Sequence, residues 1–136
     1  MADGPGTDLQ KALIDSLKAS AEVSAIVGAR IYDQPPQAVA FPYIRIGAIE
    51  PRPVRTTCGK AYIVTFGIEG YSRPKSGRVE ATRIAEAIER ALDDQELLVD
   101  GFSVTYVFFR TQTVARDADG KSYTSISAFD TLLDVA

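Results

Sequence analysis

The 136-residue chain is 46% hydrophobic and 24% charged with a net charge of −3, a composition typical of one globular domain. The negative net charge disfavours a protein that coats nucleic acid, and no apolar run approaches the roughly 18 residues of a membrane-spanning helix. The single cysteine excludes an internal disulfide, and the lack of histidine removes the commonest general base and metal ligand.

Two helical segments are expected at the N-terminal end. Residues 1–6 are rich in glycine and proline and are expected to form a flexible tail. Thr7 and Gln10 then fit a capping box. The apolar stripe of this helix consists of Leu9, Leu13 and Leu17. Ser20 is expected to cap a second, short helical turn that Gly28 ends.

Two strands are expected in the middle of the chain, over about residues 43–49 and 61–71, because apolar side chains alternate there. Pro51 and Pro53 disfavour regular structure between them. The sequence therefore predicts a loop over residues 50–59, longer than a hairpin requires.

The positive side chains of this region, Arg52, Arg55 and Lys60, form the only segment that we interpret as functional. Two interpretations stay open: the segment contacts a partner, either another protein subunit or DNA, or it is a solvated connector. Arg55 and Lys60 would lower the pKa of the Cys58 thiol beside them, but an incidental loop cysteine is the simpler interpretation.

The strongest helical pattern of the chain follows Gly77. Its expected buried stripe consists of Ala81, Ile84, Ala85, Ile88, Ala91 and Leu92. The opposite face is charged, and Glu86 lies four residues before Arg90, the spacing of a helical ion pair. Residues 97–99 are expected to pair briefly before a turn at Asp100-Gly101.

Two more strands are expected over about residues 102–110 and 123–135, with a hairpin at Asp119-Gly120. The last strand has apolar residues on both faces, which indicates burial against a neighbour. The whole pattern predicts a single α+β domain over residues 1–136. We expect a mainly antiparallel sheet of four to five strands with two main helices packed on one face.

Charge is distributed unevenly along the chain. Residues 50–78 contain six basic and two acidic side chains, whereas residues 79–136 contain five basic and eleven acidic ones. One interpretation is a molecule with a basic and an acidic surface, suited to head-to-tail contacts between copies. The other is an acidic helix and hairpin that lie beside a basic loop.

No catalytic, cofactor or metal site is predicted. Glu69 and Asp130 are carboxylates within expected strands and could in principle form an acid/base pair. Polar side chains that point outward from the sheet explain them better. The segment 117–120 shares part of a calcium-loop pattern but lacks the remaining ligands, so a hairpin turn is favoured. No glycine-rich segment fits a phosphate loop.

Two short motifs carry a resemblance to a known family. They are Gly28-Ala29-Arg30-Ile31-Tyr32 and Phe41-Pro42-Tyr43-Ile44-Arg45-Ile46. With the helix before them and the strand, helix and two strands after them, their order resembles the tail-completion (tail terminator) family of long-tailed bacteriophages and gene transfer agents. The resemblance extends from about Leu9 along nearly the whole chain.

The resemblance implies a structural virion protein, not an enzyme, that is assembled in the bacterial cytoplasm and lies at the head–tail interface. In that family, subunits form a ring, usually hexameric, that caps the tail tube and joins it to the head connector. The implied partners are further copies of the chain, the tail tube protein, the head–tail connector or stopper protein, and DNA that crosses the lumen without sequence readout. No cofactor and no membrane are implied, and the matched motif residues look structural.

Three alternative functions stay open at this point. One is another head–tail connector or stopper component, whose small domains have a similar pattern. The others are a small hydrolase with paired carboxylates and a small cytosolic ligand-binding α+β domain.

Overall fold

The computed structural model describes residues 4–56, 59–74 and 77–136 and has the expected single-domain α+β architecture. Within these residues the helices are α1 (Pro5–Ala19), α2 (Ala21–Val27) and α3 (Val79–Leu92). The strands are β1 (Ile31–Tyr32), β2 (Tyr43–Thr56), β3 (Gly59–Ser72), β4 (Phe102–Arg116) and β5 (Tyr123–Val135). Their order in the sheet is β1-β2-β3-β5-β4, antiparallel throughout except for the β1–β2 pair.

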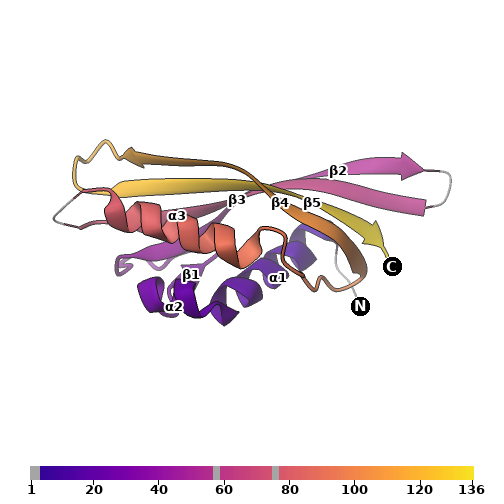
Figure 1. Cartoon of the computed structure of the whole chain (residues 1–136), viewed down its shortest axis with the longest axis horizontal. Helices are drawn as coiled ribbons and strands as arrows, with labels where there is room; N and C mark the ends of the chain where they lie inside the picture. The colour runs from indigo at the N-terminus through magenta and orange to yellow at the C-terminus, as the bar shows by residue number, and fades with distance from the viewer. Residues whose placement is uncertain (1–3, 57–58, 75–76) are drawn as a thin grey trace.

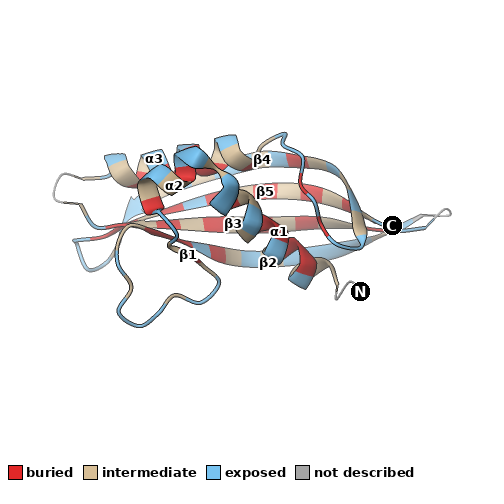
Figure 2. Cartoon of the chain, turned by 90° about the horizontal axis from the view of Figure 1, so that it is seen from below, coloured by how far each residue is buried: buried red, intermediate tan, exposed pale blue. Residues whose placement is uncertain are grey.

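All of these helices lie on one face of the elongated, twisted sheet (Figure 1). Seen from below, α3 runs over β4 and β5, whereas α1 crosses towards β2 (Figure 2). We call the opposite side of the sheet the open face, because no described helix covers it.

The core lies between the helices and the sheet. Phe66 of β3 and Phe129 of β5 stack with their ring centroids 5.3 Å apart, and both are almost fully buried. Helix α3 approaches the sheet so closely that a Cβ on Gly70 would lie 2.6 Å from the Ile84 side chain. The predicted stripe of α3 is buried as expected, except that Ala91 is only partly covered.

The first helix begins earlier than the sequence predicts. Pro5 occupies its first turn, so the end of the expected tail is helical. The Asp8 carboxylate accepts a hydrogen bond from the Gly4 N–H at 2.9 Å, and no capping side chain is recorded at the helix start. The predicted Thr7–Gln10 capping box is therefore wrong, because proline at the first helical position moves the helix start upstream of Thr7.

The two family-like motifs are adjacent in the fold. Ser20 caps α2 as predicted, and Gly28 ends it with a φ of 61°. The chain then forms β1, which pairs in parallel with β2 so that Ile31 faces Ile44. Arg30 Nε donates to the Pro42 carbonyl at 2.7 Å. The motif residues thus fix where the chain enters the sheet.

The predicted loop over residues 50–59 is wrong. Its described residues extend β2 to Thr56, and β3 begins at Gly59, so the two strands form a long hairpin. Strand β2 is an edge strand beyond Arg45, because β1 pairs only with Ile44 and Arg45. Pro51 and Pro53 are two residues apart, so their nitrogens point to the same edge, and a free edge tolerates proline.

The C-terminal hairpin and the short pairing before it are confirmed. Val99 bridges to Phe102, and β4 pairs with β5 along its whole length. The connection after α3 covers part of the β4 edge. There Asp93 accepts from the Phe109 N–H, and the Asp94 N–H donates to the Val107 carbonyl, both at 2.8 Å.

The predicted Glu86–Arg90 ion pair does not form. Arg90 instead makes a bidentate pair with Glu22 of α2, with a shortest N–O distance of 2.6 Å. The packing of α2 beside α3 brings this carboxylate within reach, and two parallel hydrogen bonds outcompete a single contact along the helix.

Candidate partner-binding sites

The predicted basic residues Arg52, Arg55 and Lys60 lie on the β2–β3 hairpin but do not converge. Arg55 is the cross-strand partner of Lys60, so the two side chains lie on the same face of the hairpin. Arg52 is three residues from Arg55, an odd number, and therefore points to the other face. The structure thus brings two of the three residues together and separates the third.

Arg55 and Lys60 form a pair of like charges at the hairpin tip. Both are exposed, and no ion pair is recorded for either among the described residues. Like charges directly opposite each other on neighbouring strands are destabilising. An anionic partner would relieve this repulsion, so the tip is suited to a contact outside the subunit.

Arg52 lies on the open face and is already engaged there. Its Nη1 donates to Thr65 Oγ1 at 3.1 Å, and Thr65 Oγ1 donates to Asp130 Oδ1 at 2.8 Å. Arg110 pairs with the other oxygen of Asp130, whose side chain is only 14% exposed. This polar row crosses β2, β3, β5 and β4 and ties the four strands together.

The candidate acid/base pair of Glu69 and Asp130 is not formed. Asp130 is opposite Thr65, four residues and therefore about 13 Å along β3 from Glu69. Arg45 pairs with Glu69 at 3.1 Å, and the Tyr71 hydroxyl donates to the same carboxylate at 2.6 Å. Burial and that hydrogen bond raise the pKa of Tyr71 above its usual range. Each carboxylate is thus neutralised by its own arginine.

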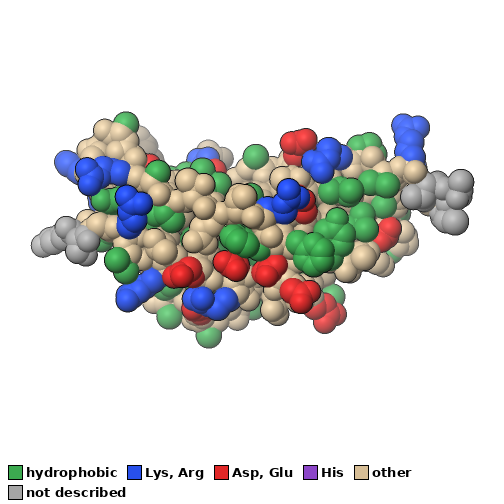
Figure 3. Space-filling model, turned by 45° about the horizontal axis from the view of Figure 1, so that its top comes forward, with side chains coloured by type: hydrophobic (Ala, Val, Ile, Leu, Met, Phe, Trp, Pro, Cys, Tyr) green, Lys and Arg blue, Asp and Glu red, His purple; other side chains and the backbone are tan. Residues whose placement is uncertain are grey.

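Basic side chains also gather at the opposite end of the sheet from the β2–β3 tip. Figure 3 views the molecule from the side of the open face and shows Lys and Arg clustered at its left end. The β4–β5 turn lies at this end (Figure 1). The described cations at this end include Arg73, Arg116 and Lys121, none of which the sequence analysis singled out.

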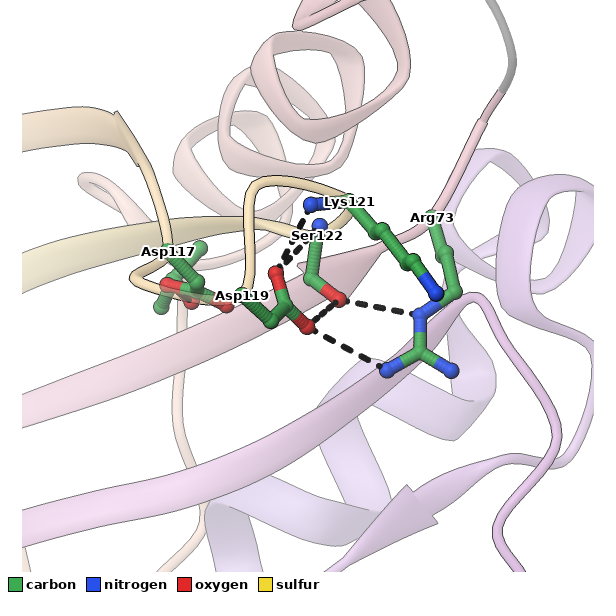
Figure 4. A network of polar contacts seen from close by, with 6 residues as sticks. Arg73, Asp117, Asp119, Lys121 and Ser122 are labelled. Atoms are coloured by element: carbon green, nitrogen blue, oxygen red, sulfur yellow. Dashed lines mark hydrogen bonds and ion pairs between the residues drawn. The ribbon is translucent and has the colours of Figure 1, made fainter.

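Arg73, just after β3, is the centre of a polar network at this end (Figure 4). Its Nε donates to Ser122 Oγ at 3.0 Å, and its Nη2 lies 3.5 Å from Asp119 Oδ2. The guanidinium lies 4.3 Å from the centroid of the Phe41 ring. Arg73 therefore connects the β4–β5 turn to the segment that leads into β2.

The carboxylates of the β4–β5 turn accept hydrogen bonds from residues in or next to the turn. Asp119 accepts from the N–H groups of Lys121 and Ser122 and from the Ser122 hydroxyl, at 2.8 to 2.9 Å. These bonds lower the pKa of Asp119 to about 2. Asp117 accepts from the Thr124 hydroxyl at 2.7 Å. The segment is a hydrogen-bonded hairpin turn, as the sequence favours over a calcium loop.

Three cations surround one surface hollow beside this turn, which we call the basic hollow. It is lined by Arg73, Pro74, Gly77, Arg116, Gly120, Lys121 and Tyr123. Arg116 Nε donates to the Tyr123 hydroxyl at 3.4 Å, and no carboxylate is among these lining residues. The end of β3, the end of β4 and the turn each supply one cation, so only the folded sheet brings them together.

Other kinds of site have little support in the described part of the chain. There, no three His, Cys, Asp or Glu residues are grouped closely enough to hold a metal ion. None of the described helices has the length and apolarity needed to cross a membrane. The space between α2, α3 and β2 has no room for a water molecule. Cys58 lies outside the described residues.

Comparison with known proteins gives a consistent result. The family model described as "Tail completion protein gp17" matches residues 11–134. A chain in the "Virion of native gene transfer agent (GTA) particle" superposes with a TM-score of 0.89 at 22% identity, covering 98% of this chain and 99% of that one. Bacteriophage SPP1 gp17 superposes with a TM-score of 0.59 at 21% identity, covering 96% and 90%. No curated protein matches the chain in sequence.

Proposed function

The chain belongs to the tail completion protein gp17 family and is a structural, tail-terminating virion protein, and on this premise we propose how it acts. Its copies assemble into a closed ring, six in number, on the last ring of the tail tube. The ring prevents addition of further tube subunits and presents its other side to the head–tail connector or stopper protein. The activity is assembly through complementary surfaces, without catalysis.

The observation that carries this proposal is the family match over residues 11–134, which spans nearly the whole domain. The arrangement of charge supports it. The charges of the open face are neutralised within the subunit. Among the described residues, Arg55 and Lys60 at the hairpin tip and Arg116 and Lys121 in the basic hollow have no carboxylate partner. Exposed unpaired charges at the ends of a subunit favour contacts with other subunits more than with a small ligand.

We further propose that DNA crosses the ring lumen through sparse contacts with phosphate and without sequence readout. Arg55 and Lys60 at the β2–β3 tip are the contacts that best fit this role, because both are exposed and repel each other. Arg52 contributes less, since Thr65 and Glu50 already engage its guanidinium. Such contacts depend on ionic strength.

Deletion of the gene in the producing bacterium tests the function. Filled heads are expected to remain intact, while tails stay unjoined or grow beyond normal length, and a plasmid copy should restore joined particles. Electron micrographs with normal joined particles would contradict the assignment. Unjoined tails of strictly normal length would instead favour a connector or stopper component.

The ring itself is tested by imaging. A cryo-EM map of the parent particle is expected to show a six-fold ring of this chain between tube and connector. Native mass spectrometry of the purified protein then tells whether the ring also forms in solution. A single copy per particle would contradict the ring while leaving the family assignment intact.

A further inference from the structure

The basic hollow contains more positive charge than its own subunit neutralises. Arg116 and Lys121 have no ion pair recorded among the described residues, and Arg73 has only the 3.5 Å contact with Asp119. The Asp119 carboxylate is already held by two backbone N–H groups and a hydroxyl of the turn. The hollow is therefore suited to receive carboxylates from outside the subunit.

A second segment of the chain has the opposite property. We call residues 93–100, between α3 and β4, the acidic connection. It carries four carboxylates: Asp93, Asp94, Glu96 and Asp100. Asp93 accepts from the Phe109 N–H, but neither Asp94 nor Glu96 forms an ion pair with any described residue. Asp100 forms a 3.9 Å contact with Lys11, in which both side chains are at least 70% exposed.

The acidic connection also presents an apolar side chain to solvent in a fixed position. Leu98 is 82% exposed, more than any other large hydrophobic residue in the described part of the chain. Its neighbours Leu97 and Val99 are buried, which anchors the backbone on both sides. The Phe102 N–H donates to the Val99 carbonyl at 3.1 Å. Leu98 and the nearby carboxylates Glu96 and Asp100 thus lie together on the surface, where they border a shallow hollow of their own.

The two features cannot meet within one subunit. The basic hollow includes Gly77, just before α3, and the acidic connection starts at Asp93, just after it. The 14 residues of α3 separate them by about 21 Å. Complementary surfaces at opposite ends of one helix fit a head-to-tail contact between copies, which forms a ring when the rotation closes.

Nucleic acid is a poorer fit for the hollow. Proteins that bind polyanions carry a basic stripe along one face. Here the unpaired cations of the described sheet lie at its two ends. Between these ends, Arg45 pairs with Glu69, Arg52 is bound to Thr65, and Arg110 pairs with Asp130. A compact group of carboxylates matches a local group of cations better than an extended phosphate chain does.

We propose that the basic hollow of one subunit receives the acidic connection of the adjacent subunit, with Arg116 and Lys121 pairing with Glu96 and Asp100 and with Leu98 covering Pro74. The proposal rests on the ring assembly proposed above and names the residues of its subunit–subunit contact.

Charge reversal tests the pairing in particles made by a deletion strain that carries a variant copy. Arg116→Glu with Lys121→Glu reverses the hollow, and Glu96→Lys with Asp100→Lys reverses the acidic connection. Each pair is expected to lower the yield of joined particles about tenfold or more, because like charges then face each other. The fourfold variant should regain a substantial part of the yield.

A matched control reverses exposed charges of α1, with Asp15→Lys and Lys18→Glu, and should keep the wild-type yield. Circular dichroism and thermal melting check that every variant folds. The proposal is overturned if either reversed pair gives the wild-type yield, or if the fourfold variant yields no more than the worse of the two pairs.

Cross-linking gives a second measurement that does not depend on charge. In a Cys58→Ser background, Lys121→Cys with Asp100→Cys should give a ladder of covalent oligomers when purified particles are treated with a bifunctional thiol cross-linker. Each cysteine alone should give none. A linker is used because a direct disulfide requires a closer approach of the two Cα atoms than an ion pair ensures. Monomer only, in particles whose cryo-EM map contains the ring, overturns this contact but not the proposed function. Particles that join normally without the protein overturn the proposed function itself.

Discussion

The two faces of the sheet are stabilised in different ways. On the helix-covered face, Phe66, Phe129 and Leu133 are buried under the helices. On the open face, side chains are satisfied laterally by their neighbours, as in the row that joins Arg52, Thr65 and Asp130. Tyr106 and Phe108 stack there with centroids 4.5 Å apart, although Phe108 is 49% exposed.

This difference underlies our proposal for where partners bind. The covered face holds the fold together, and the open face already pairs its charges. The two ends of the sheet differ: within the described part of the chain, the β2–β3 tip and the basic hollow each retain two cations without an ion pair. We therefore expect substitutions on the faces to affect stability first and substitutions at the ends to affect assembly first.

The largest effect on stability is expected for Ile84→Asp on the covered face. Ile84 is 1% exposed, and an unpaired carboxylate at this position costs several kcal/mol, comparable to the stability of a whole domain. Arg83→Asp, next to it on the exposed side of α3, is the matched control. Thermal melting should show loss of the folded state for the first variant only. Similar melting temperatures for the two variants would contradict the burial of Ile84.

The open face should respond less strongly. Asp130→Asn removes the charge that Arg110 and Thr65 bind, and we expect a loss of about 1 to 3 kcal/mol in the free energy of unfolding. Urea unfolding measures this loss, with Asp15→Asn on α1 as control. The double variant Asp130→Asn with Thr65→Val should lose less free energy of unfolding than the sum of the losses of the two single variants, because both substitutions remove the same hydrogen bond. Strict additivity would contradict a connected row.

The β4–β5 turn should make stability depend on acid pH. Because the folded state lowers the pKa of Asp119 to about 2 from 3.8, its carboxylate stabilises the fold above about pH 4. This contribution is lost as the pH falls from about 4 to about 2. Asp119→Asn should therefore melt below the wild type at pH 7 and converge with it near pH 2. A difference that does not change over this range would show that the charge is not involved.

The smallest effect on stability is expected at the β2–β3 tip. Arg55→Ala with Lys60→Ala should change the free energy of unfolding by no more than about 0.5 kcal/mol, and in the stabilising direction at low salt, since like charges are removed. Adding Arg52→Ala should cost more, because its bond to Thr65 is lost. Particle joining or DNA delivery should fall in both variants. The size of this defect should depend on ionic strength, because salt screens exposed charges. Fully active particles at every salt concentration would make the tip a connector only.

The sequence predicted the elements whose signals are local. The stripe that contains Ile84 and Ile88 identified α3, and Ser20 and Gly28 marked the ends of α2. The Asp119-Gly120 turn was also predicted, and the order of two short motifs indicated the family. Helical spacing, capping and tight turns depend on neighbours within a few residues, so they are readable before the fold is known.

The tertiary structure decided what depends on partners far along the chain. Pro51 and Pro53 indicate a loop in the sequence, but strand order makes β2 a free edge that tolerates them. Arg90 of α3 pairs with Glu22 of the neighbouring helix α2 and not with Glu86 of its own helix. The basic hollow combines Arg73 with residues more than forty positions later, Arg116 and Lys121, which only strand pairing brings together. Such groupings arise from the register of the sheet, which local patterns do not determine.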